Sequence, residues 1–192
     1  MPRAFFARPS IEVAPELLGH VLVRRPASGP HLAARIVEVE AYAPDDPASH
    51  AFRGRTERNA MMFGPPGHLY VYFTYGMHFC MNVVTGRDGE GSAVLLRAAE
   101  PLEGIDEMRR RRGRSGVHEL CSGPAKLCQA FGVDRRMDGL DLVRGSEMWL
   151  SAGEPVSAVR SGPRVGIRIG LDRPWRFRVA DDPFVSRART GR

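Results

Sequence analysis

The pattern of apolar and polar positions predicts many short strands and a few short helices. Alternation predicts a strand over residues 35–42, and a run of aromatic and β-branched residues predicts a hairpin over residues 69–84. Its turn falls at Thr74-Tyr75-Gly76, where we expect Gly76 to take a positive φ. Helices are predicted over residues 9–18, 102–112 and 121–131, and further strands over residues 20–24, 93–99, 147–150, 165–169 and 175–179. This order is typical of an α+β fold with a mostly antiparallel sheet.

Length and composition favour one domain built from short elements. The chain has 192 residues, which is the size of a single domain, and its 21 Gly and 15 Pro favour turns over long helices. Neither a repeat nor a domain boundary is visible, so we predict a single domain over residues 1–192. Residues 43–67 are rich in Pro, Gly and Asp and lack periodicity, which predicts a functional loop containing short helices.

The net charge of +6 lies at the C-terminal end of the chain. Residues 160–192 hold nine arginines and three aspartates, a difference that equals the whole net charge. This surplus suggests a polyanionic partner, although codon bias explains the preference for arginine over lysine equally well. No apolar run could cross a bilayer, no secretion signal is visible, and the three cysteines lack disulfide spacing. We therefore expect an intracellular protein with no membrane partner, which in a bacterium would be cytoplasmic and associated with the nucleoid.

Two carboxylates share one face of the strand predicted at residues 35–42. Alternation places Glu38, Glu40 and Tyr42 on one face and apolar residues on the other, which should face the core. The carboxylates would lie about 7 Å apart. A solvated strand face explains this pattern without any function. Three functional interpretations stay open: glycoside-type hydrolysis, a Mg²⁺-dependent nuclease that uses Glu38 and Glu40, and a non-catalytic nucleic-acid-binding module.

The predicted hairpin places an aromatic residue where it has little protein to pack against. Tyr75 precedes Gly76 at the tip, and an exposed aromatic there indicates an interaction site. Minor-groove binders use such residues as wedges between base steps. By contrast, His118, Cys121 and Cys128 lack a nearby fourth ligand, so we expect no metal site there.

Five long motifs follow one another along most of the chain. They read R-I-V-E-V-E-A-Y at residues 35–42, P-G-H-L-Y-V-Y-F-T-Y-G-M-H-F-C-M-N at 66–82, V-L-L-R-A-A-E-P-L-E-G at 94–104, L-C-S-G-P-A-K-L-C-Q at 120–129 and R-V-G-I at 164–167. Together they resemble the alkyladenine (3-methyladenine) DNA glycosylase family. The resemblance implies a base-excision repair enzyme with one α+β domain, a curved sheet and a protruding hairpin that enters the minor groove. Its partner would be double-stranded DNA containing damaged purines, and we expect a monomer with no metal and no other cofactor.

The resemblance also implies roles for individual residues. Glu40, and not Glu38, would be the general base, while Arg97 and the Val165 carbonyl would hold the attacking water. The other expected residues are the base-stacking Tyr42, His50 and Tyr72, the guanine-excluding Asn82, the intercalating Tyr75, and the DNA-contacting Met77, His78 and Lys126. His78 departs from the family pattern, in which Tyr is common. Lys126 is the only lysine and lies in a segment implied to be structural, so we expect a monofunctional enzyme that leaves an abasic site.

The chemistry of the damaged base fits these roles. Flipping a nucleotide out of duplex DNA costs a few kcal/mol, and a wedge can fill the gap it leaves. Alkylation at N3 or N7 makes a purine cationic, so electron-rich rings bind it better than a normal base, by about 0.5–2 kcal/mol per contact. A cationic base also leaves without protonation. The remaining task is to direct a water at the anomeric carbon, which one carboxylate can perform.

Overall fold

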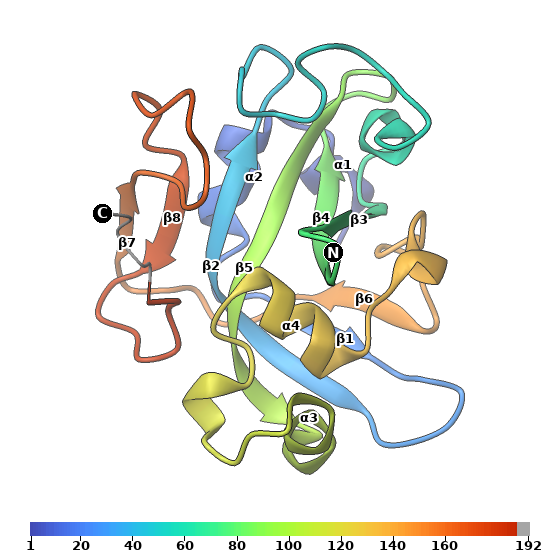
Figure 1. The fold of residues 1–192 in the computed structure, drawn as a ribbon, viewed down its shortest axis with the longest axis vertical. Coiled ribbons are helices and arrows are strands. Elements are labelled where there is room, and N and C mark those ends of the chain that lie inside the picture. Colours follow the sequence, from blue (N-terminus) through green and yellow to red (C-terminus); the bar gives the residue numbers. More distant parts are fainter. Residues whose placement is uncertain (188–192) are drawn as a thin grey trace.

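Eight antiparallel strands form one curled sheet in the computed structural model, which describes residues 1–187 (Figure 1). The order along the sheet is β3 (Leu69–Thr74), β4 (His78–Thr85), β5 (Ser92–Glu103), β2 (Leu32–Tyr42), β1 (Val21–Arg24) and β6 (Met148–Ser151). In addition, β8 (Arg176–Val179) pairs with β2 and with β7 (Val159–Gly162). The predicted α+β class and antiparallel sheet are confirmed.

Strand β2 changes neighbours halfway along one of its edges. β1 pairs with residues 32–35 of β2, whereas β8 pairs with residues 38–40. On the other edge β5 follows β2 along most of its length, with register shifts on both sides of Glu38. The sheet therefore divides beside Glu38 and Glu40, and β8 runs alongside this stretch of β2.

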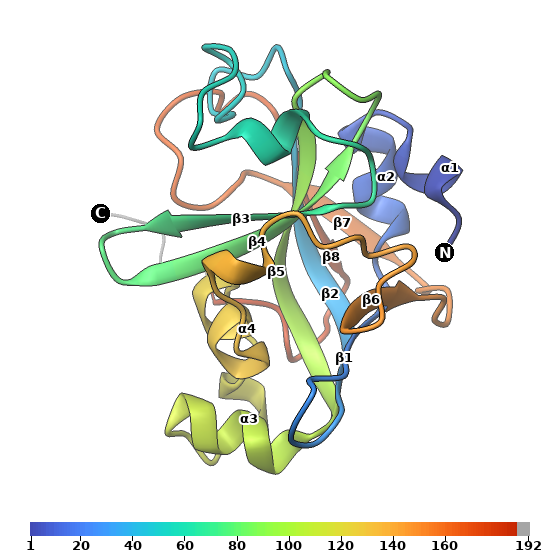
Figure 2. The ribbon, with the colours of Figure 1, turned by 90° about the vertical axis from the view of Figure 1, so that its right-hand side faces the viewer.

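Helices pack on both faces of the sheet (Figures 1 and 2). On one face, α2 (Ser10–Glu16) contacts β2 and β5 and is preceded by the short α1 (Arg3–Phe6). On the other, α4 (Pro124–Phe131) contacts β4 and β5, and α3 (Ile105–Arg112) packs against α4. Gly132 ends α4 with a φ of +66°, a conformation that glycine adopts without strain. The connections contain the 3₁₀ helices η1 (Ala60–Phe63), η2 (Val117–Glu119) and η3 (Arg135–Met137).

Some predicted element boundaries are wrong. The helix expected over residues 102–112 begins at Ile105 because β5 continues beside β2 as far as Glu103. Residues 165–169 form a loop and not a strand, since the Val165 N–H is bonded to a carboxylate of β2 and Gly166 has a φ of +80°. The short β7 and α1 were not predicted, and residues 43–67 contain only η1.

The hairpin of β3 and β4 projects from the body of the molecule (Figure 2). Its last paired residues are Thr74 and His78, so the predicted turn position is confirmed. Gly76 has the expected positive φ, +67°, but Tyr75 has one too, +51°. A non-glycine residue in this region costs on the order of 1 kcal/mol. The turn therefore keeps Tyr75 in an unfavourable conformation at the tip. Across residues 1–187, no helix combines the length and apolar character needed to cross a membrane.

Candidate active site

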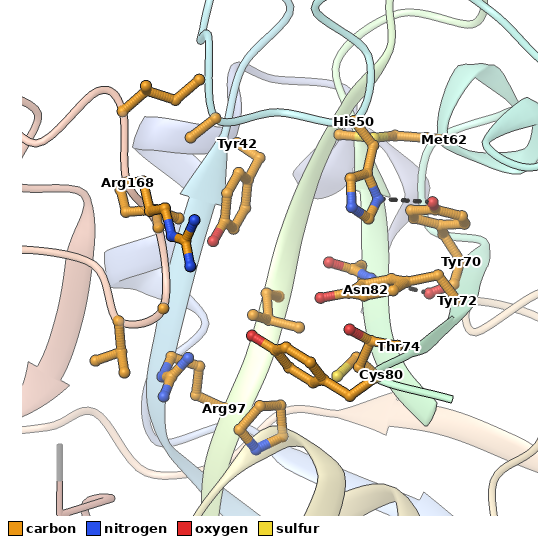
Figure 3. Close-up of a pocket in the computed structure, with 18 of the residues that line it drawn as sticks. Tyr42, His50, Met62, Tyr70, Tyr72, Thr74, Cys80, Asn82, Arg97 and Arg168 are labelled. Carbon is orange, nitrogen blue, oxygen red and sulfur yellow. Dashed lines mark hydrogen bonds between the residues drawn. The ribbon is translucent and has the colours of Figure 1, made fainter. Parts of the chain in front are cut away.

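A cavity of about 490 Å³ lies beside the hairpin, between segments that are far apart in the sequence (Figure 3). Figure 3 shows Tyr42 and Arg168 on one side and His50, Tyr70, Tyr72 and Asn82 facing them from the other. Seven residues expected in the site line the cavity: Tyr42, His50, Tyr72, Tyr75, Asn82, Arg97 and Val165. The fold thus gathers most of the expected site around one hollow.

Glu40 lies fully buried behind this cavity, and both of its carboxylate oxygens are engaged. Oε1 accepts a hydrogen bond from the Val165 N–H at 2.7 Å. Oε2 accepts one from the Tyr42 hydroxyl at 2.9 Å and lies 3.4 Å from Nη1 of Arg97. Glu40 is therefore joined to the cavity through three residues that line it. The role expected for the Val165 carbonyl stays a prediction, because the observed contact is made by its N–H.

Burial raises the pKa of Glu40 above that of an ordinary glutamate, although Arg97, the Val165 N–H and the Tyr42 hydroxyl each oppose the rise. A carboxylate with a raised pKa is a better proton acceptor near neutral pH than a solvated one. Burial, together with the neighbouring Glu40, also raises the pKa of Tyr42, so its phenol keeps the proton that it donates. The site thus presents a buried carboxylate held in place by neutral and cationic donors.

Glu38 is equally buried but has different partners. Its Oε1 accepts from Nε of Arg176 at 2.6 Å and from Nε of Arg97 at 3.2 Å, and its Oε2 accepts from the Ser186 N–H at 2.7 Å. Two of these partners belong to the C-terminal part of the chain and do not line the cavity. The interpretation of this strand face as solvated is wrong, since Glu38 and Glu40 are both 0% exposed.

Aromatic rings face the cavity from the loop after β2 and from β3. The His50 ring lies edge-on to Tyr72, with 4.6 Å between ring centroids, and its Nδ1 is 3.0 Å from the Tyr70 hydroxyl. Burial lowers the pKa of His50, with a smaller contribution from the charge of Arg58, so the ring is neutral at neutral pH. With Tyr42 opposite, these rings leave a space suited to a flat aromatic ligand (Figure 3). Tyr70, which sequence reasoning missed, fixes His50 from behind.

Asn82 lies on β4, where it is almost fully buried and faces the cavity. It pairs with Tyr70 across the hairpin, and its Nδ2 donates to the Tyr70 carbonyl at 3.1 Å. This bond fixes the amide in the cavity wall, so the side chain cannot easily move aside for a bulkier ligand. A one-residue slip in register would have turned Asn82 to the opposite face.

The remaining expected contacts lie outside the cavity or at its edge. Tyr75 is 80% exposed and Met77 69% exposed at the hairpin tip, and His78 beside them is also exposed. Lys126, in α4, places its Nζ 3.2 Å from Oγ of Ser122 and does not line the cavity. Intercalation by Tyr75 and DNA contacts by the other residues stay predictions.

The sequence alone did not reveal the support behind Tyr42. Arg164 places its guanidinium 4.7 Å from the centre of the Tyr42 ring and forms a two-pronged ion pair with Asp46. Both charged side chains are fully buried. The R-V-G-I motif marked this segment, but nothing in the sequence linked it to Asp46. Arg168, also missed, reaches the cavity from the same loop (Figure 3).

The Arg-rich C-terminal segment is only partly available to a partner. Arg164 and Arg176 are buried in ion pairs, and Arg160 and Arg173 pair with aspartates at the surface. Arg164 and Arg176 are therefore not available to the polyanionic partner that the surplus suggested, and contacts of the other arginines with such a partner stay a prediction. Arg189 and Arg192 lie outside the described residues.

Within residues 1–187, no group of three or more His, Cys, Asp and Glu side chains is placed to hold an ion. His118 stacks its ring on Phe184, with 4.5 Å between centroids, while Cys121 and Cys128 are buried free thiols. These three residues do not converge on a common site.

Comparison with known proteins shows which family the chain belongs to. The chain belongs to the methylpurine-DNA glycosylase (MPG) family, which matches residues 4–183. It is thus a DNA glycosylase, a hydrolase of DNA repair that acts on methylated purines, and the resemblance seen in the motifs is confirmed.

Three relatives illustrate the extent of the match, and each is named provisionally as a 3-methyladenine DNA glycosylase. The protein of Streptomyces avermitilis is 53% identical, covering 100% of this chain and 94% of its own. That of Burkholderia cenocepacia is 51% identical, covering 98% and 91%. That of Carboxydothermus hydrogenoformans is 49% identical, covering 97% and 98%.

Proposed function

We propose that this glycosylase flips a damaged purine out of double-stranded DNA into the cavity and hydrolyses its N-glycosidic bond with a water activated by Glu40. The observation that carries the proposal is the buried Glu40 carboxylate, which is joined to an aromatic-lined cavity by Tyr42, Val165 and Arg97. The proposed substrates are alkylated and deaminated purines, and the product is an abasic site.

Glu40 is suited to act as general base in this reaction. The water oxygen attacks the anomeric carbon, the glycosidic bond breaks with its electron pair passing to the base, and Glu40 accepts the proton of the water. Arg97 and Val165 lie beside the same carboxylate and would hold the water. The negative charge of Glu40 also stabilises the oxocarbenium-like sugar of the transition state.

The placement of the amines favours water over a lysine nucleophile. Lys126 is the only lysine, and its Nζ lies beside Ser122 and away from the cavity lining. The N-terminal amine lies 3.4 Å from the Leu150 carbonyl, on β6, and does not reach the cavity either. Neither amine is placed to form a Schiff base with the sugar, which supports monofunctional chemistry.

The cavity walls supply recognition of the flipped base. Tyr42 on one side and His50 with Tyr72 on the other would stack on the purine, favouring the electron-poor rings of alkylated bases. Asn82, held by the Tyr70 carbonyl, would meet the 2-amino group of guanine and exclude it. Tyr75 at the exposed tip would fill the gap that the flipped nucleotide leaves.

The runner-up, a Mg²⁺-dependent nuclease built on Glu38 and Glu40, is less well supported. Mg²⁺ prefers carboxylate oxygens with open coordination positions and several waters. Here two arginines and a backbone N–H already occupy the oxygens of Glu38. A non-catalytic binding module would gain nothing from burying Glu40 with a raised pKa.

The test is base release from a duplex containing 3-methyladenine, in the presence of EDTA and under single-turnover conditions. Glu40→Gln keeps the size of the side chain but cannot take a proton, so release should fall by about 10²–10⁴-fold while binding to lesion DNA persists. Glu103→Gln, at an exposed position on β5, removes the same charge away from the site and is the matched control. Undiminished release by Glu40→Gln, or loss of wild-type activity in EDTA, would overturn the proposal.

A further inference from the structure

We propose that Glu38 is a positioning residue that holds Arg97 between two carboxylates and thereby sets how far Arg97 neutralises Glu40. This inference rests on the proposed role of Glu40 as the base. It gives Glu38 a function in the reaction although its side chain makes no contact with the cavity.

The guanidinium of Arg97 contacts both carboxylates, each through a different nitrogen. Its Nε lies 3.2 Å from Oε1 of Glu38, and its Nη1 lies 3.4 Å from Oε2 of Glu40. Both distances exceed the 2.7–2.9 Å typical of a close charge-assisted hydrogen bond. Since the guanidinium is planar and rigid, a shift toward either carboxylate weakens its contact with the other. Arg97 is thus poised between Glu38 and Glu40.

Arg176 competes with Arg97 for the same oxygen of Glu38. Its Nε lies 2.6 Å from Oε1, closer than Arg97, and its Nη2 also donates to the Ser186 carbonyl. The other oxygen of Glu38 accepts from the Ser186 N–H. The C-terminal segment therefore satisfies much of the charge of Glu38, which leaves Arg97 partly available to Glu40.

The charges form a buried row in which signs alternate: Arg176, Glu38, Arg97 and Glu40. Each of these side chains is at most 7% exposed, so the charges are screened little by salt or water. The other polar or charged groups that act on Glu40 are the Tyr42 hydroxyl from β2, the Val165 N–H and Arg164 from the loop after β7, and the Cys80 thiol from β4. None of these contacts Glu38, so the row acts on Glu40 through Arg97 and through the like charge of Glu38 itself.

Removing a negative charge from the row and removing a positive charge from it should shift the pKa of Glu40 in opposite directions. Removing the charge of Glu38 removes a like charge near Glu40 and frees Arg97 to approach it, and both effects lower the pKa of the base. Removing the charge of Arg176 leaves Glu38 to draw Arg97 away, which raises the pKa of the base. A residue that merely supports the fold would not shift the pH profile in a direction that depends on its charge.

The experiment is the pH dependence of single-turnover release of 3-methyladenine, a lesion that stays cationic in DNA over the acid range. The acid limb of this profile is the range in which release falls as Glu40 becomes protonated. We expect its midpoint in Glu38→Gln to lie about 0.5–1 pH unit below that of the wild type, less than the 1–3 units by which a directly adjacent charge shifts a pKa. The limb of Arg176→Gln should lie above that of the wild type by a similar amount. Arg178→Gln, which changes a half-buried arginine on the same strand, is the matched control and should leave the limb in place.

A folded fraction that is constant with pH lowers the whole profile and leaves the midpoint of the limb in place, so rates are divided by the folded fraction measured at each pH. Arg176→Lys keeps the charge and should bring the limb back toward the wild-type position, even if it restores little stability. Limbs that shift in the same direction, or that do not shift, would overturn the inference while Glu40→Gln remains inactive. Full activity of Glu40→Gln would instead contradict the proposed function, in which Glu40 is the base.

Discussion

The hairpin tip and the buried stretch of β2 contribute to the site in contrasting ways. At the tip, Tyr75 is 80% exposed and its conformation depends on a turn of a few adjacent residues. In β2, Glu40 is 0% exposed, and its Oε1 is bonded to a residue 125 positions later in the chain. One region is local and exposed, whereas the other is assembled from distant segments and buried.

In the proposed mechanism, this difference separates the opening of the duplex from the chemistry on the sugar. A tip residue can act only on the DNA that surrounds it, so its effect should depend on whether that DNA is stacked. A buried group acts on any nucleotide that reaches the cavity, whatever its strand context. Substitutions in the two regions should therefore differ in their effects on stability and on single-stranded substrate.

The largest expected effect is on stability, from Asp46→Asn behind the cavity. Asp46 and Arg164 form a fully buried ion pair, and removing one partner leaves the other charge buried without compensation. We expect a loss of about 3–5 kcal/mol in the free energy of unfolding, measured by urea denaturation. Because Arg164 supports the Tyr42 ring, base release should fall on single-stranded and duplex substrates alike.

The neighbouring Asp45→Asn provides the control for this change. Asp45 is 74% exposed and pairs with Arg173 at the surface, so its loss should cost less than about 1 kcal/mol. Equal losses from the two substitutions would mean that the Asp46–Arg164 pair contributes no more than a surface pair, and that Tyr42 has another support.

Tyr75→Ala should act on the DNA and leave the protein intact. The tip side chain packs against little protein, so the free energy of unfolding should stay within about 0.5 kcal/mol of the wild type. If the ring holds the duplex open, release should fall by about 10-fold or more on a well-stacked lesion pair, since opening costs a few kcal/mol. Release from single-stranded DNA should hardly change. A similar loss on both substrates, measured under single-turnover conditions, would place Tyr75 in the cavity chemistry instead.

The same contrast explains which parts of the molecule could be predicted from the sequence. The hairpin turn at Thr74-Tyr75-Gly76 was predictable because turn formation is a local property of a few residues. The alternation of β2 correctly placed Glu38 and Glu40 on one face, but it could not show that distant segments bury that face. Burial depends on β8 and on the loop at residues 163–175, which periodicity assigned partly to a strand.

Charge counting is limited for a related reason. The surplus of arginine at residues 160–192 suggested a polyanionic partner, which agrees with a DNA glycosylase, yet it could not show that Arg176 is buried against Glu38, 138 positions earlier. A count of charges does not show which of them are paired, because the partners lie far away in the sequence. The family motifs, by contrast, already located most of the cavity lining, including Arg97 and Val165. Motifs carry long-range information that composition and periodicity lack.

The smallest expected effect is a pH-dependent gain in stability from Glu40→Gln. Since burial raises the pKa of Glu40 in the folded protein, folding favours its protonated form, and the ionised form destabilises the fold. That penalty is absent below the pKa of an unfolded glutamate and is complete above the raised pKa of the folded state. Glu40→Gln removes it, so the variant should melt above the wild type near pH 8, and the difference should shrink as the pH falls. Tyr75, whose strain is conformational, offers the contrast: Tyr75→Gly should raise the melting temperature by the same amount at every pH. A Glu40→Gln variant that melts below the wild type at pH 8 would mean that Arg97, Val165 and Tyr42 more than offset the burial of the charge.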